Sequence, residues 1–410
     1  MKELKALAAK LQTPCFIYDF SYIKARYEEL KSAFAGRKNN IFYAVKANSN
    51  LSLLSFLKEL GAGFDCVSFN EVKRALAVGA KPYKIILSGM GKSEEELREA
   101  LRADILLINV ESQAELFLLE GIAKELRKKA RISIRVNPNV DAKTHPYICT
   151  GLEESKFGVD LNSAKAMYLH AHKSENLLPV GIHFHIGSSI FDISSIHEAA
   201  FLVSDFAKSL KAAGLDDLHF FDIGGGLGVR YCDEKEPNLY EYAQGVLAAL
   251  KGLDMSIHLE PGRFLVANAG YLLTRVLYEK QTAKKRFIIV DAAMSELIRP
   301  ALYKAFHAVE FLDADCGKTN TFTKADLVGG ICESGDFLAQ NIKAPKTKSG
   351  DLIAIKSAGA YAQAMSSNYN SRLKVAEYAL ENGVLRQIAK AQSFEQLVEN
   401  ESCFLKEGNG

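Results

Sequence analysis

The sequence predicts an α/β protein built from a (β/α)8 barrel and a second, β-rich domain. The chain has 410 residues, of which 48% are hydrophobic, enough for the cores of two domains. Between residues 41 and 260, short apolar runs alternate with amphipathic helical patterns, which is typical of a parallel sheet. The alternation stops after residue 262. A doubly wound open sheet is the competing layout.

The barrel is expected over residues 22–262. Eight β/α units in about 240 residues is the number and length typical of such a barrel. Its helices are expected at 51–60, 70–78, 93–102, 111–129, 161–173, 192–213 and 238–251. Its strands are expected at 41–45, 63–67, 84–88, 104–108, 131–136, 180–185, 218–223 and 256–260.

The β-rich domain is expected to combine residues 1–21 with residues 263–410. Residues 1–13 have a helical pattern, and the strand at 15–19 has no place among the eight barrel units, so it is assigned to this domain. Further strands are expected at 270–277, 287–290 and 351–355, without regular helices between them, and a helical pattern returns at 371–382.

Composition narrows the possible partners and the compartment. The net charge is +2, and no apolar run reaches the ~18 residues of a membrane span, so neither nucleic acid nor membrane is expected as a partner. The seven cysteines are scattered without a Cys-x-x-Cys pair, which argues against a structural zinc or a disulfide framework. Reduced thiols and a cytoplasmic location are expected.

Polar residues gather at the predicted C-terminal ends of the strands, where barrel enzymes carry their working groups. Lys46 follows the first strand, and a partly desolvated lysine can lose its proton and form a Schiff base. The C-terminal end of the second strand gives Asp65 and Ser68, and Glu260 ends the eighth. A solvated lysine at a strand end is the structural alternative for Lys46.

The glycines at 224–226 follow the seventh strand and suit backbone N–H groups that wrap one phosphate. A dinucleotide fingerprint fits poorly, because Val229 stands where its third glycine should be. Ser188 and Arg263, at neighbouring strand ends, are expected to complete the phosphate cup. A glycine-rich turn without a ligand is the alternative.

His183 and His185 are two residues apart and face the same side of a strand. No spacing supports a third ligand, so no metal is expected. His185 is expected to pack flat on a planar ligand, whereas His183 is expected in the core. A carboxylate such as Glu260 favours a protonated ring nitrogen, and a protonated pyridine is the electron sink of pyridoxal 5′-phosphate. Together these groups describe a site for that cofactor.

The chain resembles the fold-type III pyridoxal-phosphate decarboxylases over nearly its whole length. The matching segments, in chain order, are 43–48, 150–151, 155–158, 183–188, 224–226, 260–263, 298–303, 332–336, 359–361 and 365–370. The resemblance implies that Lys46 carries the cofactor, that Cys332 donates a proton, and that a homodimer shares its active sites through the β-rich domain.

The resemblance also implies two sets of binding residues. Those expected to bind the cofactor are Lys46, Asp65, His185, Ser188, Gly224, Gly225, Gly226, Glu260, Gly262, Arg263 and Tyr361. Those expected to contact the substrate are Arg263, Arg299, Tyr303, Glu333 and Tyr361. The groups expected to be catalytic are Lys46, His185, Glu260 and Cys332.

The distal groups favour a substrate that carries both signs of charge. Arg299 can fork a carboxylate with help from Tyr303, and Glu333 can take an ammonium. This pairing favours meso-2,6-diaminopimelate, which would yield L-lysine and CO2, the last step of lysine biosynthesis by this route. The alternatives are a related decarboxylase acting on carboxynorspermidine, ornithine or arginine, and a cofactor-binding regulatory protein without turnover. A racemase is a weaker third alternative.

Overall fold

The computed structural model describes the chain except residues 1–4, 8–9, 142–155, 314–321 and 406–410. It divides the described chain into two compact units. The barrel unit comprises Lys24–Arg230 and Glu234–Leu265, and the β unit comprises Met1–Ile23, Tyr231–Asp233 and Val266–Gly410. Residues 1–4 and 8–9 of the expected N-terminal helix, and Thr150, Gly151 and Ser155 of the matching segments, lie outside the described part.

The barrel unit contains a closed barrel of parallel strands, which confirms the predicted fold class and excludes the open sheet. Closure is made by β2 and β9, where Asn39 pairs with Ile257 and Ile41 with Leu259. The strands are β2 (Asn39–Ala44), β3 (Gly63–Cys66), β4 (Ile85–Leu87), β5 (Leu107–Val110), β6 (Ala130–Arg135), β7 (Leu177–His183), β8 (Phe220–Asp222) and β9 (Ser256–Leu259).

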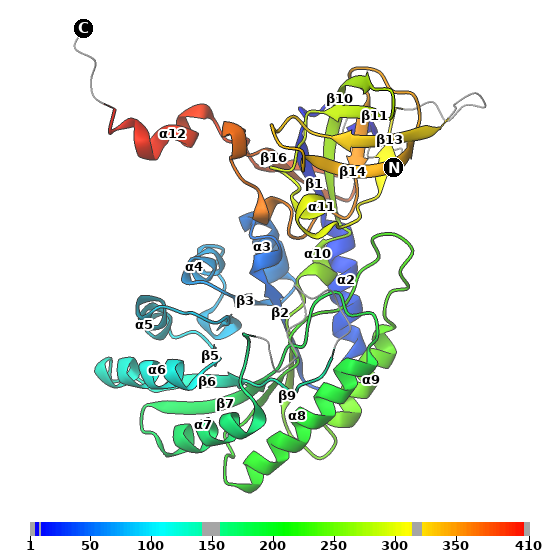
Figure 1. Ribbon diagram of the computed structural model, residues 1–410. Helices are drawn as coiled ribbons and strands as arrows, with labels where there is room; N and C mark the ends of the chain where they lie inside the picture. The colour runs from blue at the N-terminus through cyan, green and yellow to red at the C-terminus, as the bar shows by residue number, and fades with distance from the viewer. Residues whose placement is uncertain (1–4, 8–9, 142–155, 314–321, 406–410) are drawn as a thin grey trace. The chain divides into compact units, whose positions relative to one another are not determined.

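Helices lie around the outside of these strands (Figure 1). They are α2 (Phe20–Ala33), α3 (Leu51–Glu59), α4 (Phe69–Ala77), α5 (Glu94–Ala103), α6 (Gln113–Glu125), α7 (Leu161–Lys173), α8 (Ser194–Ala212) and α9 (Leu239–Ala249), with the short α10 (Arg263–Val266) after β9. Local sequence fixes their starts. Ser93 and Glu96 form a capping box at α5, and three glutamates in its first turn complement the helix dipole.

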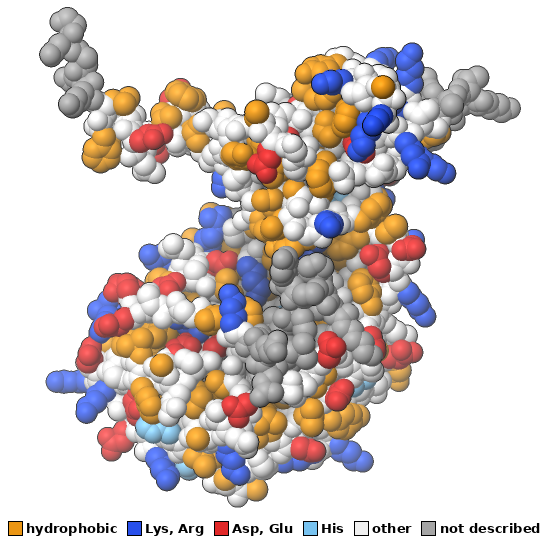
Figure 2. All heavy atoms as spheres, in the orientation of Figure 1, with side chains coloured by type: hydrophobic (Ala, Val, Ile, Leu, Met, Phe, Trp, Pro, Cys, Tyr) orange, Lys and Arg blue, Asp and Glu red, His pale blue; other side chains and the backbone are white. Residues whose placement is uncertain are grey.

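The surface over α5 and α6 mixes both signs of charge. In the space-filling view, acidic and basic side chains lie side by side over this part of the barrel unit (Figure 2). Arg98 illustrates the pattern, since its guanidinium lies 2.8 Å from both Glu94 and Glu125. None of the helices in the described part of the chain is long and apolar enough to cross a membrane.

The β unit is built on a mixed sheet in the order β14-β13-β11-β10-β1-β16-β17, with β15 pairing both β10 and β12. Its core includes Cys15, Ile17, Leu273 and Leu352. The strands are β1 (Cys15–Asp19), β10 (Gly270–Gln281), β11 (Arg286–Val290), β12 (Val309–Phe311), β13 (Thr323–Val328), β14 (Phe337–Ala344), β15 (Leu352–Ile355), β16 (Ala376–Glu381) and β17 (Val384–Ala389). Its helices include α11 (Arg299–Tyr303) and α12 (Phe394–Ser402).

The helix expected at 371–382 is wrong, because the strand β16 occupies half of that range. Asn382 and Gly383 both have positive φ, 50° and 77°, which turns the chain into a hairpin with β17. β16 also pairs in parallel with β1. This pairing overrides the helix propensity of alanine, glutamate and leucine in the segment.

Candidate active site

Lys46 lies just beyond the end of β2, in a 3-10 turn formed by Val45–Ala47. Its neighbours in the turn are buried, but the lysine side chain is 42% exposed. Its Nζ lies 3.5 Å from Oδ2 of Asp65, a fully buried residue of β3. The turn therefore presents an amine at the mouth of the barrel, beside a carboxylate.

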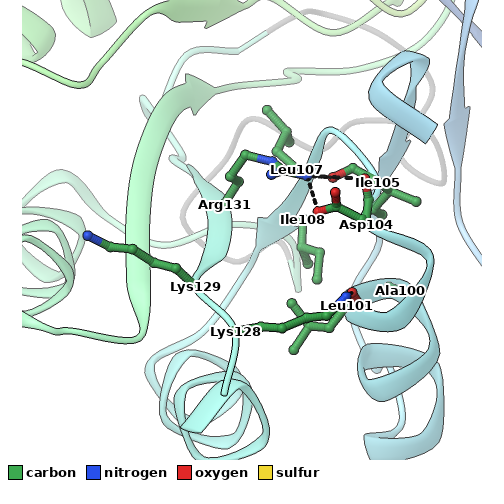
Figure 3. A pocket seen from close by; sticks show the side chains of 9 residues that line it. All are labelled: Ala100, Leu101, Asp104, Ile105, Leu107, Ile108, Lys128, Lys129 and Arg131. Atoms are coloured by element: carbon green, nitrogen blue, oxygen red, sulfur yellow. Dashed lines mark hydrogen bonds and ion pairs between the residues drawn. The ribbon is translucent and has the colours of Figure 1, made fainter. Parts of the chain in front are cut away.

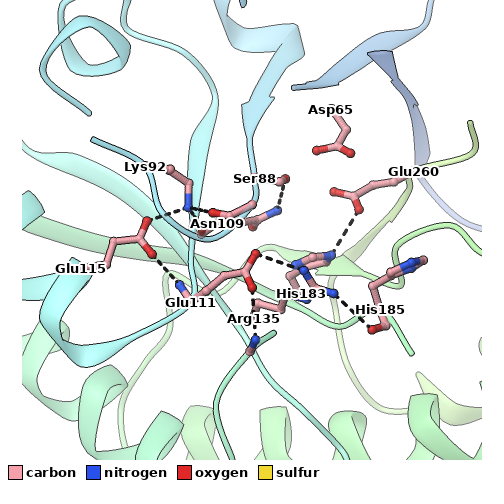
Figure 4. A network of polar contacts seen from close by, with 12 residues as sticks. Asp65, Ser88, Lys92, Asn109, Glu111, Glu115, Arg135, His183, His185 and Glu260 are labelled. Carbon is pink, nitrogen blue, oxygen red and sulfur yellow. Dashed lines mark hydrogen bonds and ion pairs between the residues drawn. The ribbon is translucent and has the colours of Figure 1, made fainter. Parts of the chain in front are cut away.

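Three buried ionisable side chains meet near that mouth. His183 ends β7, Asp222 ends β8, and Glu260 follows β9. One ligand atom from each lies within 4.8 Å of the others, and Nε2 of His183 is 3.2 Å from Oε2 of Glu260 (Figure 4). His183 thus contacts Glu260 directly. The sequence predicts only that His183 lies in the core, and it does not predict this contact. The strands bring together groups that no sequence spacing reveals.

The three buried carboxylates of the mouth differ in their pKa. Burial raises the pKa of both Asp65 and Asp222, and the charge of Glu260 raises them further. Burial acts in the same direction on Glu260, but the contact with His183 and the charge of Lys46 outweigh it and lower its pKa to about 2. Glu260 is therefore the one of the three whose pKa is lowered in spite of its burial.

The glycine loop after β8 packs tightly between two chain segments. A Cβ on Gly225 would lie 2.3 Å from the carbonyl oxygen of Glu260, and one on Gly226 would lie 2.4 Å from that of Gly187. Gly224 and Gly226 have φ of 65° and 104°, which favours glycine. The N–H of Gly225 donates to Nδ1 of His185 at 3.3 Å. The loop thus lies against both the histidine segment and the acid at the end of β9.

Arg263 and Ser188 meet beside this loop, with Nη2 of the arginine donating to the serine Oγ at 3.2 Å. Gly262 packs against the lysine turn, since a Cβ there would lie 3.1 Å from those of Ala44 and Ala47. The backbone provides a further link, because Ala44 N–H donates to Pro261 carbonyl oxygen at 3.2 Å. Phosphate-binding candidates and the reactive lysine therefore share one rim of the barrel.

Ser68, another polar residue at a predicted strand end, serves a structural purpose. Its Oγ accepts the Glu71 N–H at 3.3 Å and caps α4.

Sequence reasoning missed a network of polar contacts inside the barrel (Figure 4). Arg135, the last residue of β6, places Nη1 3.1 Å from Oε1 of Glu111 and Nη2 3.4 Å from the carbonyl oxygen of His185. The other carboxylate oxygen of Glu111 accepts the Gly158 N–H at 3.1 Å. Burial lowers the pKa of His185, and the Arg135 and Lys46 charges lower it further, so this ring stays neutral.

A small pocket lined by Ala100, Leu101, Asp104, Ile105, Leu107, Ile108, Lys128, Lys129 and Arg131 lies near the starts of β5 and β6 (Figure 3). Lys128 donates to the Leu101 carbonyl at 2.6 Å, and Arg131 to that of Leu106 at 2.8 Å. Both cations donate hydrogen bonds to backbone carbonyls near the N-terminal ends of the strands. In barrels of this kind, that face contributes to stability rather than to catalysis.

The remaining predicted residues belong to the β unit and are described with it. Arg299, on α11, is 8% exposed, and its Nη1 lies 2.9 Å from Nε2 of His307. Nδ1 of His307 lies 2.9 Å from the carbonyl oxygen of Lys356, so Nδ1 carries the proton and Nε2 accepts from the guanidinium. The Arg299 guanidinium also stacks on Tyr231 at 4.8 Å.

Tyr303 ends α11, four residues after Arg299. Tyr361 has a φ of 55°, an unusual backbone conformation for a tyrosine. Cys332 and Glu333 are exposed on the loop between β13 and β14. The two groups of predicted site residues thus fall in different units, and only those of the barrel unit are placed in one site.

The barrel site fits pyridoxal 5′-phosphate on the chemistry of its residues. Oε1 of Glu260 is buried and has no hydrogen-bond partner among the described residues, as expected of an acid that faces a ring nitrogen. The glycine loop, Ser188 and Arg263 offer donors for a phosphate, and Lys46 offers the amine. A closed parallel barrel with this set of groups defines the class of barrel-type pyridoxal-phosphate enzymes.

Comparison with known proteins specifies the family. Residues 20–267 match the pyridoxal binding domain of pyridoxal-dependent decarboxylases. Diaminopimelate decarboxylase of Campylobacter jejuni is 58% identical over 405 residues, covering 98% of this chain and all of that protein. That of Aquifex aeolicus is 47% identical, covering 97% of this chain and 93% of its own. The chain belongs to the diaminopimelate decarboxylase family.

Solved structures agree with this placement. The Helicobacter pylori diaminopimelate decarboxylase complexed with L-lysine has a TM-score of 0.93 and 50% identity, covering 98% of this chain and 100% of that one. The enzyme of M. jannaschii, also in complex with L-lysine, has a TM-score of 0.90 at 34% identity and covers 97% of this chain and 94% of its own. The family and the fold together make the protein a pyridoxal 5′-phosphate-dependent decarboxylase.

Proposed function

We propose that this protein decarboxylates meso-2,6-diaminopimelate to L-lysine and CO2, the last step of lysine biosynthesis by this route. The observation that carries the proposal is the meeting of Lys46, Glu260 and the 224–226 glycine loop at one rim of the barrel. Relatives that match nearly the full chain are named diaminopimelate decarboxylase, which supports this substrate. Bound pyridoxal 5′-phosphate supplies an acceptor for the electron pair that the departing carboxylate leaves behind.

The residues of the barrel unit divide the work of holding the cofactor. Lys46 would bind it covalently through its amine, which is exposed enough to be reached. Glu260 would face the ring nitrogen and keep it protonated, because its own pKa is low. His185, kept neutral by its surroundings, would lie on the face of the ring without repelling that proton. Asp65 would face Lys46 as its counter-charge.

The phosphate group would be held by donors at the same rim. The backbone N–H groups of the glycine loop, the Ser188 hydroxyl and the Arg263 guanidinium are the donors, with Gly262 letting the chain approach the lysine turn. We assign Tyr361 to the same task. These donors would fix one end of the cofactor, and Glu260 the other.

The β unit would supply substrate selection and the proton. Arg299, oriented by His307, would pair with the distal carboxylate and Tyr303 would assist it, whereas Glu333 would pair with the distal ammonium. We assign further substrate contacts to Arg263 and Tyr361, and the protonation of the product carbon to the Cys332 thiol. Holding both distal charges orients the scissile carboxylate.

We further propose that the enzyme is a cytoplasmic homodimer in which the β unit of one subunit completes the barrel site of the other. The predicted cofactor-binding residues lie mostly in the barrel unit, whereas most predicted substrate contacts and Cys332 lie in the β unit. This division supports an active site that two subunits share. The five cysteines in the described part of the chain are all free thiols, which supports a reducing compartment. Mixing subunits that carry Lys46→Ala with subunits that carry Cys332→Ala should restore part of the activity that each homodimer lacks.

The test is a substrate comparison with purified protein and added cofactor. CO2 release should be fastest with meso-diaminopimelate and far slower with ornithine, arginine and carboxynorspermidine, because only the first carries both distal charges. A preference for one of the other three would instead assign the protein to a related decarboxylase. Cofactor binding without turnover of any of the four would point to a regulatory protein.

A further inference from the structure

The segment Ser366–Asn370, which shares a sequence motif with the family but has no role so far, contacts the loop that carries Cys332 and Glu333. Oδ1 of Asn370 accepts the backbone N–H of Cys332 at 2.9 Å. The carboxylate of Glu333 interacts with the side chain of Tyr369 and raises the pKa of its hydroxyl. Two consecutive residues of the segment therefore hold the two consecutive residues assigned to proton donation and ammonium binding.

The Cys332 loop is exposed, so its conformation depends on such contacts. A second contact holds the same stretch from the buried side, where Oδ2 of Asp336 accepts the Ile331 N–H at 2.7 Å. The other oxygen of Asp336 accepts the Met294 N–H, also at 2.7 Å. Two successive amides, those of Ile331 and Cys332, are thus fixed by side-chain oxygens from different parts of the unit.

Asn370 suits this position in two ways. Its φ and ψ of 53° and 29° lie in the left-handed region, which asparagine tolerates better than most residues. Its short side chain carries the amide oxygen that reaches the Cys332 N–H. Glycine would keep the backbone conformation and lose the acceptor, whereas aspartate would keep an oxygen at the same place. The two properties can therefore be separated by substitution.

We propose that Asn370 is a positioning residue that fixes the Cys332 thiol for proton transfer, and that Tyr369 orients the Glu333 carboxylate for the distal ammonium. The inference rests on the proposed function, since it assumes the roles given there to Cys332 and Glu333. It adds two residues that act through those groups. Neither is assigned a contact with the substrate.

The first experiment asks whether the hydrogen bond exists, in the full-length protein without cofactor. Hydrogen–deuterium exchange of the peptide containing Cys332 is measured by mass spectrometry. Asn370→Gly should raise the exchange rate about tenfold at that amide, and Asn370→Asp should leave it near the wild-type rate. Asn382→Gly is the matched control, because Asn382 has a similar φ of 50° in an exposed turn. Unchanged exchange in Asn370→Gly overturns the proposal.

The second experiment asks whether the bond matters for the reaction. A thiol displaced by about an ångström should lower kcat with diaminopimelate roughly ten- to hundredfold in Asn370→Gly, with KM nearly unchanged. The solvent deuterium isotope effect on kcat should rise, because proton transfer becomes slower. Asn370→Asp should restore both values, and Asn382→Gly should match wild type. Tyr369→Phe should instead raise KM and leave the isotope effect unchanged.

The outcomes separate this inference from the proposed function. Wild-type protein that does not decarboxylate diaminopimelate refutes the proposed function and, with it, the positioning role of Asn370. Active wild-type protein with an unaltered kcat and isotope effect in Asn370→Gly refutes only the positioning role. A fall in kcat that Asn370→Asp does not restore also refutes it. A thermal midpoint equal to wild type excludes loss of folded protein as the cause.

Discussion

Gly225→Ala should damage cofactor binding through a collision with the backbone. The added Cβ would lie 2.3 Å from the carbonyl oxygen of Glu260 and 3.1 Å from its carbonyl carbon, whereas ordinary contacts begin at 3.4 Å. The loop must therefore withdraw by about 1 Å. The neighbouring hydrogen bond from Glu260 N–H to the Gly224 carbonyl, at 2.7 Å, resists that movement or breaks.

The expected loss follows from these distances. Overpacking of this kind costs about 1–3 kcal/mol, and a lost hydrogen bond adds about 1 kcal/mol. If half of this cost weakens cofactor binding, the cofactor Kd rises about five- to thirtyfold. Because the same shift moves both phosphate donors and the acid that faces the ring, kcat should fall on the order of a hundredfold.

The assay is a titration of apoenzyme with pyridoxal 5′-phosphate, followed by its visible absorbance, together with CO2 release. Gly121→Ala is the matched control, because a Cβ on this glycine of α6 meets no atom within 4 Å. That change should stabilise the fold by about 0.5–1 kcal/mol and leave Kd unaltered. Wild-type affinity and kcat in Gly225→Ala would show that the loop does not hold the cofactor.

Three further predictions concern the lysine, the substrate arginine and pH. Lys46→Ala should abolish both the visible absorbance of bound cofactor and CO2 release; an unchanged spectrum would refute its role. Arg299→Ala should reduce turnover of diaminopimelate at least tenfold more than residual turnover of lysine or ornithine; equal losses would refute recognition of both charges. Burial raises the pKa of Glu279, but hydrogen bonds from Arg286 and Thr347 outweigh it and lower the pKa to about 2. Its stabilisation is therefore present above about pH 4.5 and lost as pH falls towards 2, so Glu279→Gln should lower the thermal midpoint at pH 7 but much less at pH 2.5. An equal loss at both pH values would contradict the linkage.

Much of the barrel and its mouth could be predicted because parallel strands end at one rim. Lys46, Asp65 and Glu260 come directly after, or at the end of, apolar runs that are easy to recognise. The structure places the first two 3.5 Å apart. For these residues, the position along the chain determines the position in space.

The polar network was missed because strand boundaries were misplaced by a few residues. The fourth strand is expected to end at residue 108, but β5 runs to Val110, so Glu111 directly follows the strand only in the structure. Arg135 lay inside the expected strand 131–136, although it is the last residue of β6 and faces Glu111. An error of two residues in the predicted end of a strand is therefore enough to miss a functional residue that directly follows the strand.

The cluster of His183, Asp222 and Glu260 depends on the register of the neighbouring strands β7, β8 and β9, in which His183 pairs with Asp222 and Asp222 with His258. Burying several carboxylates together raises the free energy of their charged forms. Asp65 and Asp222 respond with a raised pKa, and Glu260 keeps its charge because His183 lies 3.2 Å away. Glu260 thus combines a lowered pKa with a buried oxygen that has no hydrogen-bond partner among the described residues, which suits one protonated ring nitrogen. This electrostatic selection explains why a fold used for many chemistries suits a pyridine cofactor in this chain.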